Sequence, residues 1–374
     1  MITLPIALSL GVAVGVAVAV GVASIVSQYV QPYSFVRARS LKSLLTKPGK
    51  IEELISSTDQ GFTQILSSHS LSEYYDLANV SSDIELKYEL SKYIKNIYNS
   101  TTLLSSEKEK AFLNLYSSSI DLLTYKLLIA KWLKGDPDPD TSSIPKTTIF
   151  NDEMINKILT SKDTYSLTNI KGLEKITHGL ESILEEARLS KNTSDINKIY
   201  YELEHKFYKS LLYEAKKIKS ESLERFLKIE IDLLNLEKII RGLNLGVNPV
   251  VIQSQLIPIQ YKMHDDIIKN ISNFKDAFSF LQSLDIPEYK DVIDVTINTL
   301  NDDSNPIKIR NVFRNYLVKY ASKAFSKEMF SVTLIASLIK LQLFQIEVLE
   351  TIFRGKQLNL ENDKIHTLVE YFEL

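Results

Sequence analysis

The stretch that decides the fold reads Ile231-Asp-Leu-Leu-Asn-Leu-Glu-Lys-Ile-Ile-Arg-Gly242, and the chain contains two further versions of it. Residues 120–131 lie 111 positions earlier and repeat the Ile-Asp-Leu-Leu opening. Residues 344–355 lie 113 positions later and repeat the ending, since Arg354-Gly355 matches Arg241-Gly242. One structural element used three times is the prediction that follows.

Each copy has the spacing of an amphipathic helix. Apolar residues recur at intervals of three and then four, which places them on one helical face. They are Leu122, Tyr125 and Ile129 in the first copy, Leu233, Leu236 and Ile240 in the second, and Ile346, Leu349 and Phe353 in the third. An Arg followed by Gly is typical of a helix C-terminus, where Gly adopts the left-handed cap. We therefore predict three long helices, of which the second and third end at Arg241 and Arg354.

A second set of matches extends the repeat beyond these helices. Ile155, Ile158 and Asp163 recur 113 positions later as Ile268, Ile271 and Asp276. A linker at 135–145 contains two Asp-Pro pairs, and Asn248-Pro249 begins another boundary. No segment alternates with period two, so the fold class is all-α. We predict three pseudo-threefold-related helical units at 33–146, 147–256 and 257–374.

The amino-acid composition disfavours nucleic-acid binding and excludes sites that depend on cysteine. The 374 residues are 44% hydrophobic and 24% charged, with a net charge of −2. This balance disfavours a general nucleic-acid binder, which carries a basic surface. The sequence contains no Cys, which excludes disulfides, thiolate metal sites and a Cys nucleophile.

The first 32 residues predict a transmembrane helix. The first charged side chain is Arg37, and 5–30 consist almost entirely of apolar and small residues. Basic residues follow between 37 and 50, so the positive-inside rule leaves the rest of the chain cytoplasmic. Gly11, Gly15 and Gly21 would let this helix pack closely against others. A signal peptide is the alternative. However, this segment has no basic residues at its start, and its apolar run is too long for a signal peptide.

The sequence contains no motif that is typical of a catalytic or metal-binding site. The histidines are His69, His178, His205, His264 and His366, and none has metal-ligand spacing with another. The acidic residues near His178 and His205 are typical of a solvated helix face. Asp302-Asp303 lacks a second acidic partner at diphosphate-binding spacing, and Asp136, Asp138 and Asp140 are interrupted by prolines. We predict no catalytic residue, no metal, no cofactor and no small-molecule substrate.

Three segments together resemble a known family. Tyr33-Ser-Phe-Val-Arg-Ala-Arg-Ser-Leu-Lys-Ser-Leu-Leu45 resembles the opening of the C subunits of archaeal A-type ATP synthases, which are related to the d subunit of the vacuolar ATPase. Ile231, Asp232, Asn235 and Leu236, followed by Arg241, are similar to the central helix of that family. Arg354-Gly355-Lys356 and the closing segment 361–372 are similar to its ending. The resemblance covers about residues 33–374.

The repeat is imperfect at its polar positions. Gln345 stands where the other copies have Asp121 and Asp232, and Ala130 stands in place of the Arg. These departures put the polar contact at those positions in doubt, more than the fold. We therefore regard Asp121, Asp232, Arg241 and Arg354 as structural residues of the repeat helices.

Membership in this family would imply a funnel of three helical units on the cytoplasmic surface of the proteolipid ring. The funnel would receive the central stalk and turn with it, so that torque passes between the ion-driven ring and the ATP-forming head. The partners would be the proteolipid ring subunits, the stalk subunits and the membrane. We also hypothesise that residues 5–30 enter the lumen of the ring, where a crosslinker at Val14 would reach its inner helices. The alternative is a membrane-tethered helical scaffold that recruits protein partners without rotation.

Overall fold

The computed structural model describes residues 33–67, 80, 82–103, 105–135, 141, 144–190, 193–302, 305–328 and 330–370. Within these ranges the chain is helical, and no residue belongs to a strand. The all-α fold class predicted from the sequence is therefore confirmed for the part of the chain that is described. The predicted transmembrane helix, with Gly11, Gly15 and Gly21, lies outside these residues.

Short and long helices alternate along the chain. Residues 33–41 are helical and precede the first labelled elements. The α-helices are α2 (Pro48–Ser56), α3 (Asp59–Ser67), α4 (Asp83–Thr102), α5 (Glu107–Ser117), α6 (Ser119–Lys134), α7 (Asp152–Thr160), α8 (Tyr165–Thr168), α9 (Glu174–Thr177), α10 (Glu181–Ser190), α11 (Thr193–Ile218), α12 (Glu221–Asn244), α13 (Pro249–Ser254), α14 (Asp265–Lys269), α15 (Ala277–Gln282), α16 (Lys290–Asp302), α17 (Pro306–Lys327), α18 (Val332–Gln357) and α19 (Asn362–Val369). Three 3-10 turns join them, η1 (Lys42–Leu44), η3 (Asn270–Asn273) and η4 (Pro287–Tyr289).

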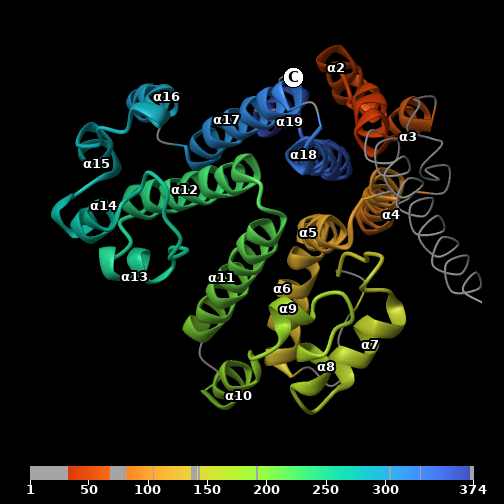
Figure 1. Cartoon of the computed structure of the whole chain (residues 1–374), viewed down its shortest axis with the longest axis horizontal. Helices are drawn as coiled ribbons and strands as arrows, with labels where there is room; N and C mark the ends of the chain where they lie inside the picture. The colour runs from red at the N-terminus through yellow and green to blue at the C-terminus, as the bar shows by residue number, and fades with distance from the viewer. Residues whose placement is uncertain are drawn as a thin grey trace, which may run out of the picture.

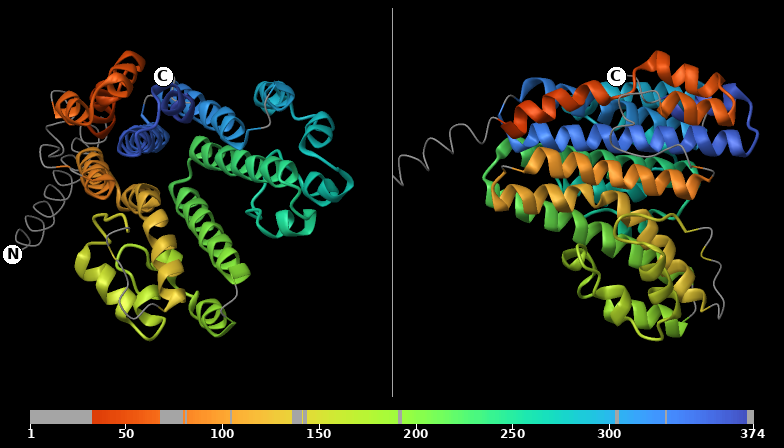
Figure 2. Two further views of the ribbon diagram at one scale, coloured as in Figure 1. Left: turned by 180° about the vertical axis from the view of Figure 1, so that it is seen from behind. Right: turned by 90° about the vertical axis from the view of Figure 1, so that its right-hand side faces the viewer.

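Three groups of short helices surround a set of long ones (Figure 1). One group contains α13 to α16, another contains α7 to α10, and the third contains α2 and α3. The long helices α5, α11, α12, α17 and α18 lie between these groups and pack on one another. Turned by 90°, the molecule shows several long helices running side by side (Figure 2).

Local sequence sets where the long helices begin. Ser82 and Ser106 form capping boxes at α4 and α5, in which each side chain accepts a backbone N–H and a Glu three residues later closes the box. Asn305 caps α17, and its Pro306 fits the first helical turn. Lys219, with φ 61°, separates α11 from α12. Ser118 separates α5 from α6.

The three repeat helices end in the same way, although not at the residues the sequence predicts. The left-handed residues are Gly135 after α6, Gly246 after α12 and Asn359 beyond α18, with φ of 64°, 67° and 52°. In each case this N–H donates to the carbonyl three residues earlier, at 3.1, 3.1 and 2.8 Å. The prediction that Gly242 and Gly355 are the caps is wrong, because both lie inside their helices.

Gly242 and Gly355 are needed instead for close helix contact. A Cβ on Gly242 would lie 2.6 Å from Cδ1 of Ile252, and a Cβ on Gly355 would lie 2.7 Å from Cγ1 of Ile365. Both isoleucines follow their glycine by ten positions and are carried by α13 and α19. The short helix after each repeat helix thus folds back onto a glycine, which local sequence preference does not reveal.

The start and the end of the described chain pack together. The helix α18 lies against α3 and α4, and α19 lies against α2. The buried Lys356 ammonium donates to the carbonyl oxygens of Ile55, at 2.7 Å, and Ser57, at the C-terminal end of α2. The rings of Phe62 and Phe353 lie 5.3 Å apart in the same contact. The last helices of the described chain therefore pack against its first helices.

One described helix, α18, has the length and apolar composition to cross a membrane. Most of this apolar stretch is buried among the other helices, as in the core helix of many globular folds. The residues that make it apolar, among them Leu334, Ile335, Leu338 and Ile339, are fully buried. We therefore interpret α18 as the central core helix.

Candidate functional site

Asp232 is a fully buried carboxylate in the middle of α12. Its Oδ2 accepts the backbone N–H groups of Lys262 and Met263 at 2.6 and 3.2 Å, and its Oδ1 accepts that of Tyr261 at 3.2 Å. The Tyr289 hydroxyl donates to Oδ2 at 2.8 Å. Successive N–H groups of this kind form a nest for an anion. Asp232 therefore fastens the loop that follows α13, and η4, onto α12.

Asn235, one turn further along α12, fixes the same loop. Its amide donates to the Ile257 carbonyl and its oxygen accepts the Ile257 N–H, both at 2.9 Å. Both residues belong to the Ile-Asp-x-x-Asn-Leu signature, so the signature organises the loop at 257–263. Both side chains bond within the protein, so they offer no group to a substrate.

Asp121 occupies the matching place on α6 and is also buried, with 4% of its surface exposed. Its Oδ1 has no hydrogen-bond partner among the described residues. Burial raises its pKa to about 6, and the Thr147 hydrogen bond and the charges of Lys95 and Lys87 oppose this rise. The carboxylate thus sits in a less complete environment than Asp232.

Gln345 keeps a polar contact at the third position, where the sequence comparison put one in doubt. Its Oε1 accepts the backbone N–H of Thr46 at 2.6 Å, and the side chain is buried. A neutral amide accepts a hydrogen bond without a buried charge. The doubt about this contact is therefore resolved: the contact is present, with a partner near the other end of the chain.

Arg241 and Arg354 lie at the solvent side of a charged row that crosses four helices. The Arg241 guanidinium is 3.5 Å from the Glu237 carboxylate on α12, and Arg314 of α17 pairs with Glu347 of α18. The Lys87 ammonium of α4 is 3.6 Å from the Glu350 carboxylate of α18. The name charged row denotes these residues: Lys87, Glu350, Glu347, Arg314, Glu237 and Arg241.

Burial dominates the electrostatics of this row. It raises the pKa of Glu237, with Arg314, Arg241 and Arg310 opposing the rise. It also raises the pKa of Glu350, where Lys87 and Arg354 oppose the rise and Glu347 adds to it. Half-buried pairs of alternating sign gain little net stability but strongly disfavour a mismatched packing. The Lys87–Glu350 and Arg314–Glu347 pairs therefore disfavour a mismatched packing of α18 against α4 and α17.

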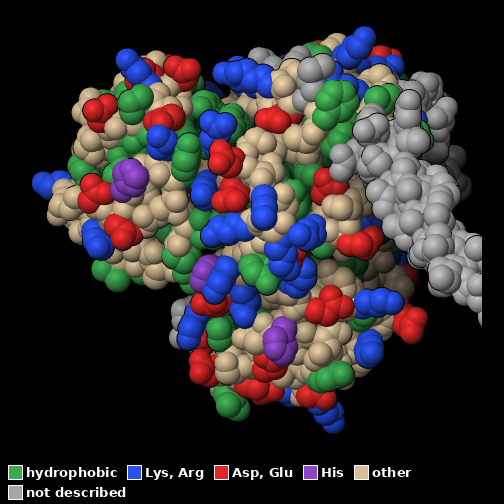
Figure 3. Space-filling view, in the orientation of Figure 1, with side chains coloured by type: hydrophobic (Ala, Val, Ile, Leu, Met, Phe, Trp, Pro, Cys, Tyr) green, Lys and Arg blue, Asp and Glu red, His purple; other side chains and the backbone are tan. Residues whose placement is uncertain are grey.

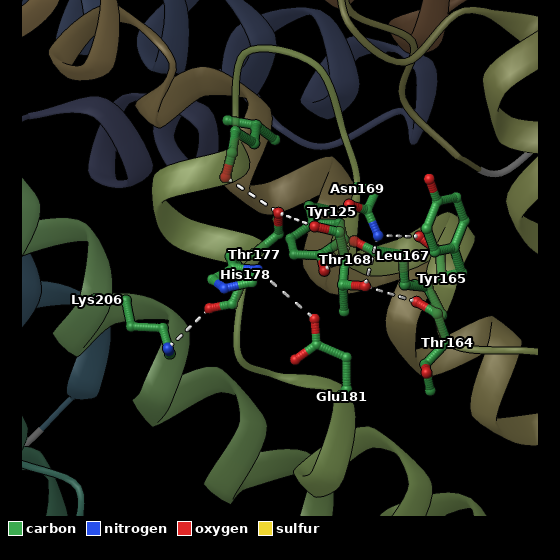
Figure 4. A network of polar contacts seen from close by, with 11 residues as sticks. Tyr125, Thr164, Tyr165, Leu167, Thr168, Asn169, Thr177, His178, Glu181 and Lys206 are labelled. Carbon is green, nitrogen blue, oxygen red and sulfur yellow. Dashed lines mark hydrogen bonds and ion pairs between the residues drawn. The ribbon is translucent and has the colours of Figure 1, made fainter.

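None of the described histidines belongs to the charged row, and His366 pairs with Glu52 at 2.8 Å. His69 lies outside the described residues. His178 is exposed, and its ring is 3.9 Å from the Glu181 carboxylate. Around it, hydrogen bonds run mainly to backbone carbonyls: Tyr125 to Leu167 at 2.8 Å, Thr177 to Thr168 at 2.7 Å and Lys206 to His178 at 3.0 Å (Figure 4). This network holds α8 and α9 against α6 and α11, and none of its groups has the geometry of an acid–base pair.

The described residues also form concave features, and few of the side chains that line them could act in catalysis. A cavity of about 620 Å³ lies between α16 and α17, lined by Val295, Tyr316 and Lys319 among others. Within the described ranges, no three His, Asp or Glu side chains are placed to hold a metal ion. On the face shown in Figure 3, Lys and Arg side chains gather near the middle, with Asp and Glu among them.

The site residues that sequence reasoning missed are those whose partners are distant in the chain. Gln345 with Thr46 and Lys356 with Ile55 join positions about 300 residues apart. Glu237, Arg314 and Glu347 look like ordinary charged residues of amphipathic helices. No local signal distinguishes Lys356 from the nearby Arg354, since both lie in the last turn of α18.

Within the described helices, the buried polar side chains fasten helices to loops, which favours a structural protein as the class. The comparisons agree with this class. The chain belongs to the ATP synthase (C/AC39) subunit family, whose model matches residues 35–368. Its role in that complex is structural and not catalytic.

Two relatives illustrate the membership. The chain is 22% identical over 356 residues to the C subunit of the A-type ATP synthase of Methanocaldococcus jannaschii, a match that covers 90% of this chain and 86% of the relative. It is 26% identical over 304 residues to the C subunit of the A-type ATP synthase of Thermococcus kodakarensis, with 77% and 76% covered. The resemblance inferred from the sequence motifs is therefore confirmed.

Proposed function

We propose that this chain is the non-catalytic rotor subunit of an A-type ATP synthase. In this proposal it couples the central stalk to the membrane proteolipid ring and transmits torque for proton- or sodium-driven ATP synthesis. The three helical units at 33–146, 147–256 and 257–374 form a funnel around the stalk. The A-type ATP synthase is membrane-associated, and we place the folded units on its cytoplasmic side, anchored by the N-terminal helix.

The observation that carries the proposal is the closed packing of the long helices. The last helices pack against the first ones through Lys356 and Gln345, so no unit is left at a free end. Within the charged row, the Lys87–Glu350 pair joins the first proposed unit to the third. A body that transmits a twist needs such contacts, because a unit held by one flexible linker would rotate independently.

The surface also suits protein partners. We propose that the mixed charges near the middle of the face in Figure 3 contact another protein of the complex, because complementary charges orient two partners. We propose that the stalk docks on such a polar surface inside the funnel. The alternative function, a membrane-tethered scaffold without rotation, uses the same fold but requires no fixed angle between the units.

Purification from native membranes distinguishes the two functions. The tagged chain is extracted in a mild detergent, and every protein that elutes with it is identified and quantified by mass spectrometry. A rotor component should elute with proteolipid, stalk and nucleotide-binding subunits in fixed stoichiometry. A scaffold would elute with partners in varying ratios, and elution without ATP synthase subunits would reject the rotor proposal.

A further inference from the structure

Glu230 is a buried acidic residue of α12 with three hydrogen-bond donors around its carboxylate. Its Oε2 accepts the hydroxyl of Tyr116 at 2.8 Å. Its Oε1 accepts the hydroxyl of Tyr208 at 3.0 Å and the ammonium of Lys340 at 2.8 Å. Only 3% of Glu230 is exposed, so water does not compete for these bonds.

The three donors come from three different long helices. Tyr116 lies on α5, Tyr208 on α11 and Lys340 on α18, which place one donor in each of the three proposed units. These helices also pack together, since α5 contacts α11 and α18, and α12 contacts α11 and α18. The Glu230 carboxylate therefore bonds to side chains from all three proposed units.

Aromatic rings enclose this point. Tyr116 stacks on Phe112, with ring centres 5.7 Å apart, and meets the edge of Phe226 at 6.5 Å. Phe226 in turn stacks on Tyr320 of α17 at 5.6 Å. The Lys340 ammonium lies 4.9 Å from the centre of the Phe344 ring. A charged pair inside such an apolar shell has strict geometry, because any displacement leaves a buried charge without a partner.

Both phenols act as donors over the whole physiological range. Burial, and then the charge of Glu230, raise the pKa of Tyr116 well above its usual value. The same two causes raise the pKa of Tyr208. Both phenols therefore remain protonated hydrogen-bond donors to Glu230.

We propose that Glu230 is the positioning residue that locks the three helical units at one mutual orientation, through Tyr116, Tyr208 and Lys340. We call this group of four the Glu230 junction. Its mechanical consequence rests on the proposed rotor function: a locked junction makes the whole chain turn as one body. A loosened junction lets the units shift against one another while each remains folded.

Hydrogen–deuterium exchange of the full chain in mild detergent tests the lock. Glu230→Gln retains the shape but removes the charge, and Lys340→Met removes the cation. In both variants, amide exchange in the middle of α5 and α18 should rise by about tenfold or more, while α7 and α16 remain unchanged. Exchange within about twofold of the parent protein, in folded variants, would overturn the proposal.

Matched variants separate the lock from general destabilisation. Glu214→Gln removes another buried carboxylate, whose ion pairs with Lys175 and Lys217 lie within one proposed unit. It should leave exchange in α5 and α18 unchanged. If Glu230→Gln fails to fold, Tyr116→Phe and Tyr208→Phe provide the milder series, in which each should loosen its own helix. The double variant Glu230→Gln/Lys340→Met should increase exchange by less than the product of the two single effects.

The mechanical consequence has a separate measurement. In purified ATP synthase carrying Glu230→Gln, ATP hydrolysis should persist while fewer ions are transported per ATP than with Glu214→Gln. An unchanged ratio, together with faster exchange, would overturn the mechanical part of the proposal. If the chain does not assemble with an ATP synthase at all, the proposed function fails, and the exchange data alone decide whether the junction exists.

Discussion

Asp232 and Asp121 occupy matching positions on two repeat helices, yet their surroundings differ. Asp232 accepts three backbone N–H groups and a tyrosine hydroxyl. Asp121 leaves one oxygen without a hydrogen-bond partner among the described residues. A repeated residue therefore does not guarantee a repeated environment. The loop that meets the helix decides whether a buried carboxylate stabilises the fold or strains it.

Gln345 shows a third solution at the same position. It accepts one N–H, from Thr46, and carries no charge. The loop it meets belongs to the start of the chain, so this contact closes the molecule, whereas Asp232 holds a loop that follows it directly. Substitutions at these and neighbouring positions test the differences, beginning with the largest expected effect.

Asp232→Ala should be the most damaging of the substitutions. It removes the acceptor for four donors in a buried site, which leaves them unpaired. We expect the free energy of unfolding to fall by about 3 to 5 kcal/mol, measured by chemical denaturation in mild detergent. Tyr289→Phe, which removes one of the four donors, should lower it by only about 1 kcal/mol. A loss below about 1 kcal/mol for Asp232→Ala would refute the anchoring role.

Gln345→Leu should weaken the closure between the chain ends. The Thr46 N–H would lose its acceptor in a buried place, and we expect a loss of about 2 kcal/mol in the free energy of unfolding. Hydrogen exchange at Thr46 should increase, whereas exchange at 261–263 should stay as in the parent protein. Equal acceleration in both loops would mean that the two contacts are not independent.

Gly242→Ala tests the close approach of the repeat helix to α13. Helix propensity favours Ala by about 1 kcal/mol, but the new Cβ would meet Ile252 at 2.6 Å. Overpacking of this kind typically costs about 1 to 3 kcal/mol, so we expect a net loss of about 1 kcal/mol. The double variant Gly242→Ala/Ile252→Ala should show recovery of the overpacking cost. Gly135→Ala, with no atom near its Cβ, should reveal only the strain of a positive φ.

The sequence predicted the helical class and the three repeat helices because both depend on local periodicity. The structural role of Asp232 and Asp121 stays a prediction, and both side chains are buried. The partners themselves were not predictable, because Thr46 lies about 300 residues from Gln345 and no local pattern links them. The caps were misplaced for the same reason: an Arg-Gly pair matches a local rule, while Ile252 and Ile365 impose the glycine from elsewhere.

Asp121→Asn should change how the free energy of unfolding depends on pH. It should leave the value of this free energy at acidic pH unchanged. Burial raises the pKa of Asp121 from 3.8 to about 6, so the folded protein binds a proton more tightly than the unfolded chain. The resulting stabilisation is complete below about pH 4 and decreases as the pH rises through 6. Asn has no proton to lose. The free energy of unfolding of the Asp121→Asn variant, relative to that of the parent protein, should therefore rise by about 1 kcal/mol between pH 5 and 7.5. Asp232→Asn should instead lower the free energy of unfolding at pH 7.5, because it replaces an acceptor of three N–H groups by an amide that cannot accept them all. A parallel pH profile for Asp121→Asn and the parent protein would show that burial does not raise the pKa of Asp121.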